Sequence, residues 1–502
     1  MVMYDTSMRG PPGQATPGGG RRVYEPLIDG RAHSTSKVTD VVHPYDGTKV
    51  GSIGVGTRRD AEAAIEAAGL AFEKWSRTPA HTRAAKLQAV ASLIEDRSDL
   101  LAWAITAELG KPIRDSEGEV RRSSGIVRRA AEEAVRFAGE VIPTDGYEGS
   151  ESRFAFTMRV PLGTVACIVP FNFPVSSILH KVAPALAAGN SVVIKPASAT
   201  PVSAILLGEI FADAGMPPGT VNVVPGPAAE VGAELVGSDR VAMVSFTGSA
   251  RAGVEIRRHA GYKRVQLEMG GNSGVIVHSD ADLAAAARTV AHQGTSCAGQ
   301  VCLAVQRVYV QESVSSEFLQ LLLSEFQRLK IGDPFDRSTD VGPLVNEGEA
   351  KRIEAWISEA RTQGATVETG GERIAAIVQP TILTHTSPSM RIVAEELFGP
   401  AVALSDYRSI DDAIDLVNNS IYGLQAGVFT SNVATAFHAA RGVQAGGVMI
   451  NDGPRYRIDS MPYGGTKMSG IGREGTRYAM EEMTDVRVVV FNNPPAGRQS
   501  SP

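Results

Sequence analysis

TVACIVPFNFPVSSILHKVAPALAAGNSVVIK, residues 164–195, combines a short apolar run, a turn, a helical stretch and a second apolar run. Short runs rich in Val and Ile, separated by helix-length segments, are typical of parallel strands joined by crossover helices. The same pattern continues to Phe246. It predicts an α/β unit with strands at 164–169, 191–194, 220–224 and 241–246 and helices at 180–188, 201–214 and 229–236.

After predicted strands around Gln266 and at Gly274–Val277, a second series of strands and helices begins. Its predicted strands are Arg307–Gln311, Ala401–Ser405, Gly427–Thr430 and Gly447–Asn451. Its predicted helices are Ala281–Gln293, Ser316–Leu329, Glu349–Gln363, Ile410–Asn418 and Ala434–Arg441. We therefore expect a second α/β domain. The earlier region from Arg59 to Glu140 is mostly amphipathic helix.

Two segments with alternating polarity, Ser152–Pro161 and Thr484–Phe491, fall outside both predicted sheets. Strands of this kind commonly pair with another subunit, but they also cover the open edge of a sheet in their own chain. Both interpretations remain open at this point.

The composition excludes several classes of protein. The chain has 502 residues, 43% of them hydrophobic, so two or more domains are expected. A net charge of -6 without a basic run argues against nucleic acid as a partner, and no apolar stretch approaches the roughly 20 residues of a membrane span. Residues 1–22 have no apolar core, so we expect a disordered leader and a cytoplasmic protein. Three cysteines make a disulfide framework implausible.

Six short motifs point to one family. They are PFNFP (170–174), KPA (195–197), FTGS (246–249), LEMGG (267–271), GQVC (299–302) and EELFGP (395–400). In this order and spacing they resemble the aldehyde dehydrogenase superfamily, over a span from Val38 to Phe491. The resemblance implies an α/β fold with a Rossmann-like parallel sheet in a cofactor domain, a second α/β catalytic domain and a small β oligomerisation segment. The expected bounds are 23–145 and 165–276 for the cofactor domain, 277–475 for the catalytic domain, and 146–164 and 476–495 for the oligomerisation segment.

The resemblance assigns Cys302 as the nucleophile. An aldehyde loses hydride only after a tetrahedral adduct has formed, and a thiolate can supply that adduct. Cys302 lies in a polar segment beside Gln300, where we expect an exposed thiol whose pKa is lowered below about 8.5. Cys297 is expected to pack locally, and Cys167 lies inside an apolar strand and is expected in the core.

Two further residues complete the expected catalytic set. Asn172, at a strand end, is expected to donate a hydrogen bond to the oxyanion of the adduct, and the alternative is a local Asx-turn. Glu268, between apolar neighbours, is expected to have a raised pKa and to activate the water that hydrolyses the thioester. The alternative for Glu268 is a buried salt bridge. This glutamate favours water over coenzyme A as the acyl acceptor.

The cofactor is expected to be NADP or NAD. In the family, a lysine at the position of Lys195 meets the adenosine ribose, and many NAD-preferring members carry Glu where Ser198 stands. Because serine would not repel a 2′-phosphate, we favour NADP slightly, although Ser198 could merely start a helix. The other expected cofactor residues are Phe171, Gly226, Gly248, Ser249, Glu396 and Phe398. The nine histidines show no paired metal-ligand spacing.

The substrate is the least defined part of the prediction. Arg457, two residues before Asp459 and four before Met461, has the place of an arginine in lactaldehyde, phosphonoacetaldehyde and non-phosphorylating glyceraldehyde-3-phosphate dehydrogenases. A guanidinium suits an anionic group, and Arg455 could assist. The alternative is an ion pair of Arg457 with Asp459 or with another subunit. We expect a homodimer or homotetramer that oxidises a small anionic or hydroxylated aldehyde to the acid.

Other functions remain as alternatives. They are a generalist dehydrogenase of neutral aldehydes, a coenzyme A-acylating semialdehyde dehydrogenase and a non-catalytic scaffold on the same fold. The presence of Glu268 disfavours the second, and the combination of Cys302, Glu268 and Asn172 disfavours the third, since a scaffold has no use for all three.

Overall fold

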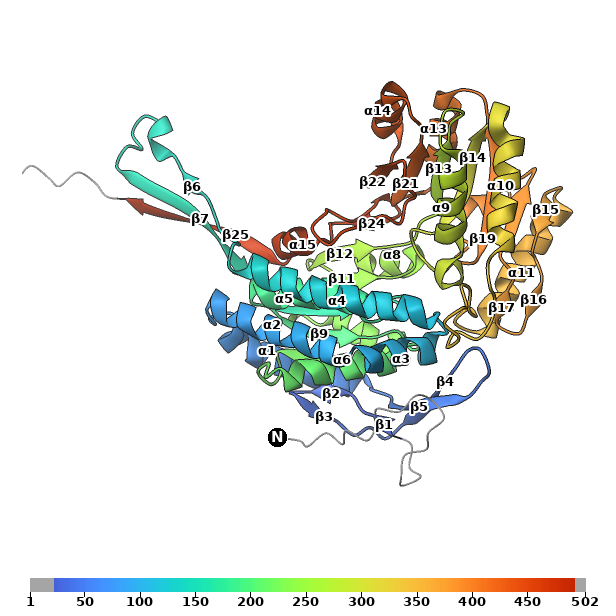
Figure 1. Cartoon of the computed structure of the whole chain (residues 1–502). Helices are drawn as coiled ribbons and strands as arrows, with labels where there is room; N and C mark the ends of the chain where they lie inside the picture. The colour runs from blue at the N-terminus through green and yellow to red at the C-terminus, as the bar shows by residue number, and fades with distance from the viewer. Residues whose placement is uncertain (1–21, 493–502) are drawn as a thin grey trace, which may run out of the picture.

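Two mainly parallel β-sheets, each flanked by helices, form the body of the protein in the computed structural model, which describes residues 22–492 (Figure 1). The first sheet has eight strands in the order β24-β12-β11-β8-β9-β10-β2-β3. They are β2 (Leu27–Ile28), β3 (Arg31–Ala32), β8 (Thr164–Ile168), β9 (Ser191–Lys195), β10 (Val221–Val223), β11 (Val241–Thr247), β12 (Arg264–Glu268) and β24 (Gly470–Ile471). The four predicted strands are confirmed. Strands β8 to β12 pair in parallel, and their burial on both faces explains their continuous apolar sequences.

Two of the four crossover helices of the first sheet, α5 (Ser176–Ala188) and α6 (Pro201–Asp213), begin at caps supplied from elsewhere in the chain. The other two are α7 (Ala233–Gly237) and α8 (Ala250–His259). Glu119 accepts hydrogen bonds from the first free amides of α5, and Glu108 does the same for α6. The cap from Glu119 explains why α5 begins at Ser176, before the predicted start at His180. Gly189, with a φ of 100°, ends α5 in the left-handed region.

The second sheet has seven strands in the order β15-β18-β19-β14-β13-β21-β22. They are β13 (Ser273–Val277), β14 (Val305–Gln311), β15 (Thr366–Thr369), β18 (Thr381–Thr384), β19 (Ala401–Tyr407), β21 (Gln425–Phe429) and β22 (Gly447–Ile450). The helices of this part are α9 (Leu283–Thr295), α10 (Ser315–Gln327), α11 (Glu347–Thr362), α12 (Arg391–Ala394), α13 (Ile410–Asn418) and α14 (Val433–Gly442). The strand predicted at Gly274–Val277, the four predicted strands of the second series and all five predicted helices are present.

The pairing of two strands corrects the expected boundaries of the domains. β13 pairs with β14 and β21, so it belongs to the second sheet and not to a first domain that ends at residue 276. The change of sheet falls between Glu268 and Ser273. β24, inside the segment expected for the second domain, returns to the first sheet and pairs with β12. A two-residue strand has no sequence pattern of its own, because its tertiary neighbours create it.

The chain before β8 is mostly helical, as predicted, and a small sheet is formed by strands that precede these helices. The helices are α1 (Arg58–Trp75), α2 (Ala80–Asp96), α3 (Ser98–Leu109) and α4 (Ile113–Ala134). The small sheet contains β1 (Val23–Tyr24), β4 (Val38–Val42) and β5 (Lys49–Gly54), which were not predicted. α4 packs on α2 and α5 and shares their hydrophobic core. The predicted leader, residues 1–22, lies outside the described residues except for Arg22, which pairs with Glu209.

The two alternating segments form a separate three-stranded sheet that projects from the body (Figure 1). Its strands are β6 (Val141–Ile142), β7 (Arg153–Pro161) and β25 (Thr484–Asn492). β7 and β25 pair antiparallel along nine residues each, so they cover an edge of neither large sheet. Val486, Val488 and Val490 are exposed along β25. Within residues 22–492, no helix is long and apolar enough to cross a membrane.

Candidate active site

Cys302 lies in a loop between the end of α9 and β14. The short helical turn Ser296–Gly299 precedes it, and Cys297 and Ala298 have a φ of 53° there. Gly299 continues the left-handed path with a φ of 70°, and a Cβ at this position would lie 2.1 Å from the carbonyl oxygen of Gly399. Only glycine fits this turn. Cys302 is partly exposed, whereas Cys167 and Cys297 are buried, in agreement with the packing roles predicted for them.

The expected lowering of the Cys302 pKa is wrong, because the pKa is raised. Burial raises the pKa of the Cys302 thiol to about 11, and the nearby carboxylates of Glu396 and Glu268 raise it further, against a hydrogen bond with Tyr463 that lowers it. The Sγ of Cys302 lies 3.2 Å from the hydroxyl of Tyr463. The sequence motif places the cysteine in a polar segment but does not reveal the two acidic groups that the fold brings beside it.

Asn172 reaches across the molecule to the Cys302 loop. It follows β8, is 5% exposed, and its side-chain amide donates a hydrogen bond of 2.7 Å to the carbonyl of Gln300. The sulfur of Cys297 in turn lies 4.0 Å from the backbone carbonyl of Asn172. The local Asx-turn is therefore not what holds this side chain. Its amide contacts the Cys302 loop at Gln300, two residues before the thiol in the chain.

Glu268 is the last residue of β12, and its carboxylate makes no hydrogen bond within the described part of the chain. The side chain is buried, and neither carboxylate oxygen has a hydrogen-bond partner among the described residues. Burial raises its pKa well above the usual value, and the negative charge of Glu474 adds to this effect. The predicted rise is confirmed, and the alternative of a direct salt bridge is not observed. A Cβ at Gly464 would lie 2.8 Å from the Oε1 of Glu268, so any side chain at position 464 would collide with the carboxylate.

Glu474, a charged neighbour of Glu268, belongs to a cluster of ion pairs that the sequence did not predict. Glu474 accepts hydrogen bonds from Lys181 at 2.8 Å and from Arg457 at 3.2 Å. Burial alone would raise the pKa of Glu474, but the two cations lower it to about 2. His180 lies 3.3 Å from Arg457, and burial together with that guanidinium lowers the pKa of His180 well below its ordinary value. A lysine inside the otherwise apolar helix α5 was the available signal for a buried partner.

The two arginines of the predicted substrate loop have different surroundings. Arg457 pairs with Glu474 and stacks on the ring of Tyr463, with 3.7 Å from its guanidinium carbon to the ring centroid. The predicted alternative partner, Asp459, instead binds Arg122 at 2.7 Å. Arg455 interacts electrostatically with Asp115 and, more weakly, with Cys297 and Cys302. Its buried Nη1 has no hydrogen-bond partner within residues 22–492, and the same is true of the Nε of Arg457.

The carboxyl ends of β8, β9, β10 and β11 lie side by side along one edge of the first sheet. Four expected cofactor residues lie at or shortly after these ends: Lys195 is the last residue of β9, Gly226 follows β10, and Gly248 and Ser249 follow β11. In open α/β sheets nucleotides bind at such an edge. Gly226 would place a Cβ 2.5 Å from the carbonyl oxygen of Gly56, so the backbone turn there stays open only with glycine. Ser198 is exposed nearby, and Ser249 caps α8 by accepting a hydrogen bond from Ala252.

Glu396, Phe398 and Phe171 meet where the two sheets face each other. Glu396 accepts a hydrogen bond of 3.1 Å from the amide of Gly271, and burial raises its pKa to about 7. Phe398, with a φ of 54°, meets Phe171 edge to face at 5.8 Å between ring centroids. These residues fit a nicotinamide nucleotide, since a carboxylate and two aromatic rings adjoin the Cys302 loop. The described residues contain no group of His, Cys, Asp and Glu placed to hold a metal ion.

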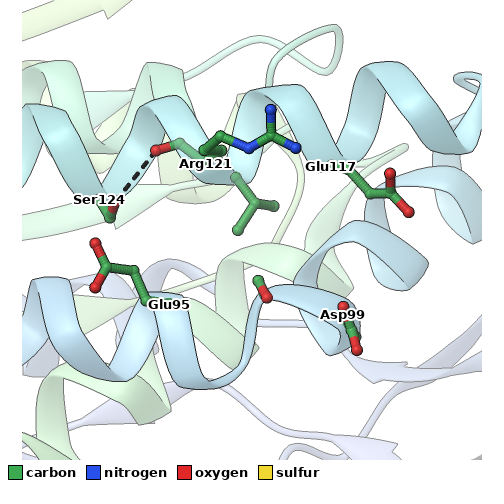
Figure 2. A pocket seen from close by; sticks show the side chains of 7 residues that line it. Glu95, Asp99, Glu117, Arg121 and Ser124 are labelled. Carbon is green, nitrogen blue, oxygen red and sulfur yellow. Dashed lines mark hydrogen bonds between the residues drawn. The ribbon is translucent and has the colours of Figure 1, made fainter.

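A surface hollow of about 380 Å³ between α2, α3 and α4 is a separate feature (Figure 2). Acidic side chains line it, among them Glu95, Asp99 and Glu117, together with Arg121. Glu95 is engaged by Arg128 and Glu117 by Arg337. None of the candidate catalytic or cofactor residues lines this hollow, so it is not the site described above.

A parallel sheet with a nucleotide-type edge, facing a thiol and a buried carboxylate, defines the architecture of a dinucleotide-dependent oxidoreductase. The sequence profile of the aldehyde dehydrogenase family matches residues 31–489, and the chain belongs to that family. It is an NAD(P)-dependent, non-acylating aldehyde dehydrogenase.

Three similar proteins illustrate the match. The 3-sulfolactaldehyde dehydrogenase of Priestia aryabhattai is 44% identical over 469 residues, covering 93% of this chain and 98% of the relative. Aldehyde dehydrogenase 21 of Physcomitrella patens, solved with the reaction product succinate, has a TM-score of 0.91 at 36% identity and covers 95% of this chain and 99% of its own. Betaine aldehyde dehydrogenase of Staphylococcus aureus, solved with NAD+, has a TM-score of 0.90 at 34% identity, with 94% and 95% covered.

Proposed function

We propose that the protein oxidises a small anionic aldehyde to the carboxylic acid. The observation that carries this proposal is the buried Nη1 of Arg455, which has no partner in the described part of the chain although the guanidinium interacts electrostatically with Cys302. A buried guanidinium donor without a hydrogen bond is unfavourable, and an anionic substrate group would accept one from it. Arg457, whose charge Glu474 already balances, is better suited to a supporting position than to the first contact with substrate.

The reaction follows from the residues at the site. The thiolate of Cys302 attacks the aldehyde carbon, and the amides of Asn172 and Cys302 donate to the oxyanion. When bound, the nicotinamide cofactor accepts the hydride, which leaves a thioester on Cys302. Glu268 then takes a proton from water, hydroxide adds to the thioester, and the carbon–sulfur bond breaks to release the acid.

Two of the similar proteins support an anionic substrate. One is named a dehydrogenase of 3-sulfolactaldehyde, a sulfonated aldehyde, and another was solved with succinate. Sulfonate and carboxylate both suit a guanidinium with free donors. A sulfonated or carboxylated three-carbon or four-carbon aldehyde is therefore the class of substrate that we favour.

We infer NADP as a cofactor at least as good as NAD. Ser198 is exposed at the nucleotide edge, and a serine adds no negative charge against a 2′-phosphate. The first sheet would bind this cofactor, and the second would carry the thiol. A nucleophilic thiol must stay reduced, which favours a cytoplasmic location.

We also infer a homo-oligomer built through the projecting sheet. β25 is its outer strand, and a nine-residue edge beside exposed Val486, Val488 and Val490 is expected to be covered by another subunit. Light scattering at several concentrations, with Val488→Lys as the disrupting variant, tests this inference. A monomer at every concentration of the wild type would contradict it.

The experiment that tests the function is reduced-cofactor formation with NAD and NADP, across sulfonated, carboxylated, hydroxylated and neutral aldehydes of matched length. Anionic aldehydes should lead in kcat/KM by about 10- to 100-fold, the value of hydrogen bonds to a charged group. A lead by neutral aldehydes would overturn the substrate proposal, and consumption of coenzyme A would overturn hydrolysis as the second half of the reaction.

A further inference from the structure

We propose that the hydroxyl of Tyr463 is a catalytic hydrogen-bond donor to the sulfur of Cys302, both when the thiolate attacks and when it leaves. This inference rests on the proposed role of Cys302 as the nucleophile. Tyr463 transfers no proton in this role. It stabilises the negative charge on sulfur at the two points of the cycle where that charge is present.

The contact between the two side chains is direct. The Oη of Tyr463 lies 3.2 Å from the Sγ of Cys302, a short distance for a hydrogen bond to sulfur. Within residues 22–492, no other hydrogen bond to this sulfur is present. Asn172, the expected oxyanion donor, is bonded to the carbonyl of Gln300 and does not serve the sulfur. The thiolate would otherwise face the carboxylates of Glu268 and Glu396 without a donor.

The backbone holds Tyr463 firmly at the sulfur. Its amide donates to the carbonyl of Glu474 at 2.9 Å, and the amide of Glu474 donates back at 2.7 Å. The ring is 5% exposed, so rotation away from the thiol would require repacking of the core. The neighbouring Gly464 has a φ of 153°, which few other residues would adopt. A donor held in this way needs no reorganisation when the charge appears.

The direction of the hydrogen bond follows from the environment of the phenol. Burial, followed by the neighbouring sulfur, raises the pKa of Tyr463 well above its ordinary value. The phenol therefore keeps its proton whenever Cys302 is ionised, and it can only donate to a thiolate. Arg457 lies over the ring face at 3.7 Å, where a positive charge draws electron density from the ring and strengthens the O–H donor.

The hydroxyl of Tyr463 acts in two steps of the reaction, and the negative charge is conserved in each. In the first, the thiolate forms the carbon–sulfur bond and its negative charge moves to the aldehyde oxygen. In the second, hydroxide from the water deprotonated by Glu268 adds to the thioester, the carbon–sulfur bond breaks, and the electron pair returns to sulfur. A hydrogen bond from Tyr463 stabilises the thiolate as the leaving group and raises the thiolate fraction of the resting protein.

The test is the pH dependence of Cys302 alkylation by iodoacetamide in Tyr463→Phe. This neutral probe needs no substrate arginine, and the variant removes one oxygen while keeping the ring under Arg457. We expect the thiol pKa to rise by about 1 to 2, with alkylation below that pKa roughly 10- to 100-fold slower. Tyr407→Phe is the matched control, because its buried hydroxyl bonds His278 and the carbonyl of Val277, away from the thiol.

The outcomes separate the two proposals. The label should map to Cys302 by peptide analysis, and Tyr407→Phe should match the wild type. An unchanged alkylation profile in Tyr463→Phe, with the label still on Cys302, would overturn the donor role alone. A label on Cys167 or Cys297 in the wild type would overturn both this inference and the assigned nucleophile. Thiolate ultraviolet absorbance provides a second readout, and it should show the same rise in pKa.

Discussion

Glu268 and Glu474 are both buried, yet their surroundings differ in every other respect. Glu268 has no hydrogen-bond partner among residues 22–492, and burial raises its pKa well above the usual value. Glu474 contacts Lys181 and Arg457, and these cations lower its pKa to about 2 despite the same burial. The pKa values of two identical side chains in one cluster are thereby shifted in opposite directions.

The difference indicates that burial alone does not decide the state of a carboxyl group. A buried charge is tolerated where cations surround it, and a group without them favours its neutral form. Arg455 and Arg457 each have one buried donor without a hydrogen-bond partner, but among residues 22–492 only Arg457 forms an ion pair, with Glu474. We infer that the groups without partners react or bind, and that the paired groups hold the structure around them. The following substitutions test that division.

Cys302→Ala should have the largest effect. Without the thiol no covalent adduct forms, so oxidation of every aldehyde should fall below detection in a reduced-cofactor assay. The free energy of unfolding in urea should stay within about 1 kcal/mol of the wild type, because the partly exposed sulfur has few contacts to lose. Measurable turnover in this variant would mean that another group starts the reaction.

Glu268→Gln should lower steady turnover by about 100- to 10,000-fold, the range of general-base catalysis. A burst of reduced cofactor should still appear, because the thioester forms before the base is needed. Stopped-flow absorbance distinguishes the burst from the slow phase. Steady turnover at the wild-type rate would contradict the assigned role of Glu268.

The Glu268→Gln variant also tests the comparison of Glu268 with Glu474 through the free energy of unfolding. The pKa of Glu268 in the folded protein lies above the unfolded value of about 4.3, so ionisation at rising pH destabilises the wild type. The glutamine has no proton to lose. Urea unfolding should therefore favour Glu268→Gln increasingly from about pH 4.3 upward. A variant that is less stable than the wild type at neutral pH would show that Glu268 is a paired group after all.

Glu474→Gln should lower the free energy of unfolding, the opposite of the effect expected for Glu268→Gln. Removal of one charge leaves Lys181 and Arg457 buried without their counter-ion, which costs about 3 to 5 kcal/mol. Stability from a lowered pKa is present above the unfolded value and is lost as the pH falls towards about 2. The difference in the free energy of unfolding between this variant and the wild type should therefore be largest at neutral pH and should decrease in acid. Equal stability of both proteins at pH 7 would refute the structural role.

Arg455→Met should lower kcat/KM for anionic aldehydes by about 10- to 100-fold and leave neutral aldehydes unchanged. Arg457→Met is the contrasting variant, because its charge is paired with Glu474 and its removal should reduce stability as well. Kinetics and urea unfolding on both variants separate the two effects. A loss of the anionic preference in Arg457→Met without any loss of stability would reverse the assignment of the two arginines.

Long buried strands were predictable from the sequence, and short added strands were not. β8 and β9 appear within one residue of the predicted bounds, because burial on both faces requires uninterrupted apolar residues. β24 has two residues and no pattern, so neither its existence nor its return to the first sheet could be inferred. The boundary near Ser273 failed for a related reason, since adjacent strands with similar sequences can join different sheets.

The site was predictable as a set of motifs but not as a set of contacts. Cys302, Glu268 and Asn172 were chosen from the sequence, and the fold brings them into one region, while their roles stay predictions. The partner of Lys181 lies 293 positions away, and no local pattern indicates such a pair. The pKa of Cys302 was misjudged because the carboxylates that raise it come from distant parts of the chain.

The pair of Lys181 and Glu474 also bears on how the chain is made. Lys181 lies in α5, while Glu474 is synthesised 293 residues later, close to β24 and α15 (Thr476–Glu482), and α15 packs on α5. Because synthesis adds only about 5 to 20 residues per second, the nascent first sheet must wait tens of seconds with an open edge and an uncompensated lysine. We therefore expect the yield of folded enzyme in the cell to depend on chaperones and to be lowered by prematurely terminated chains.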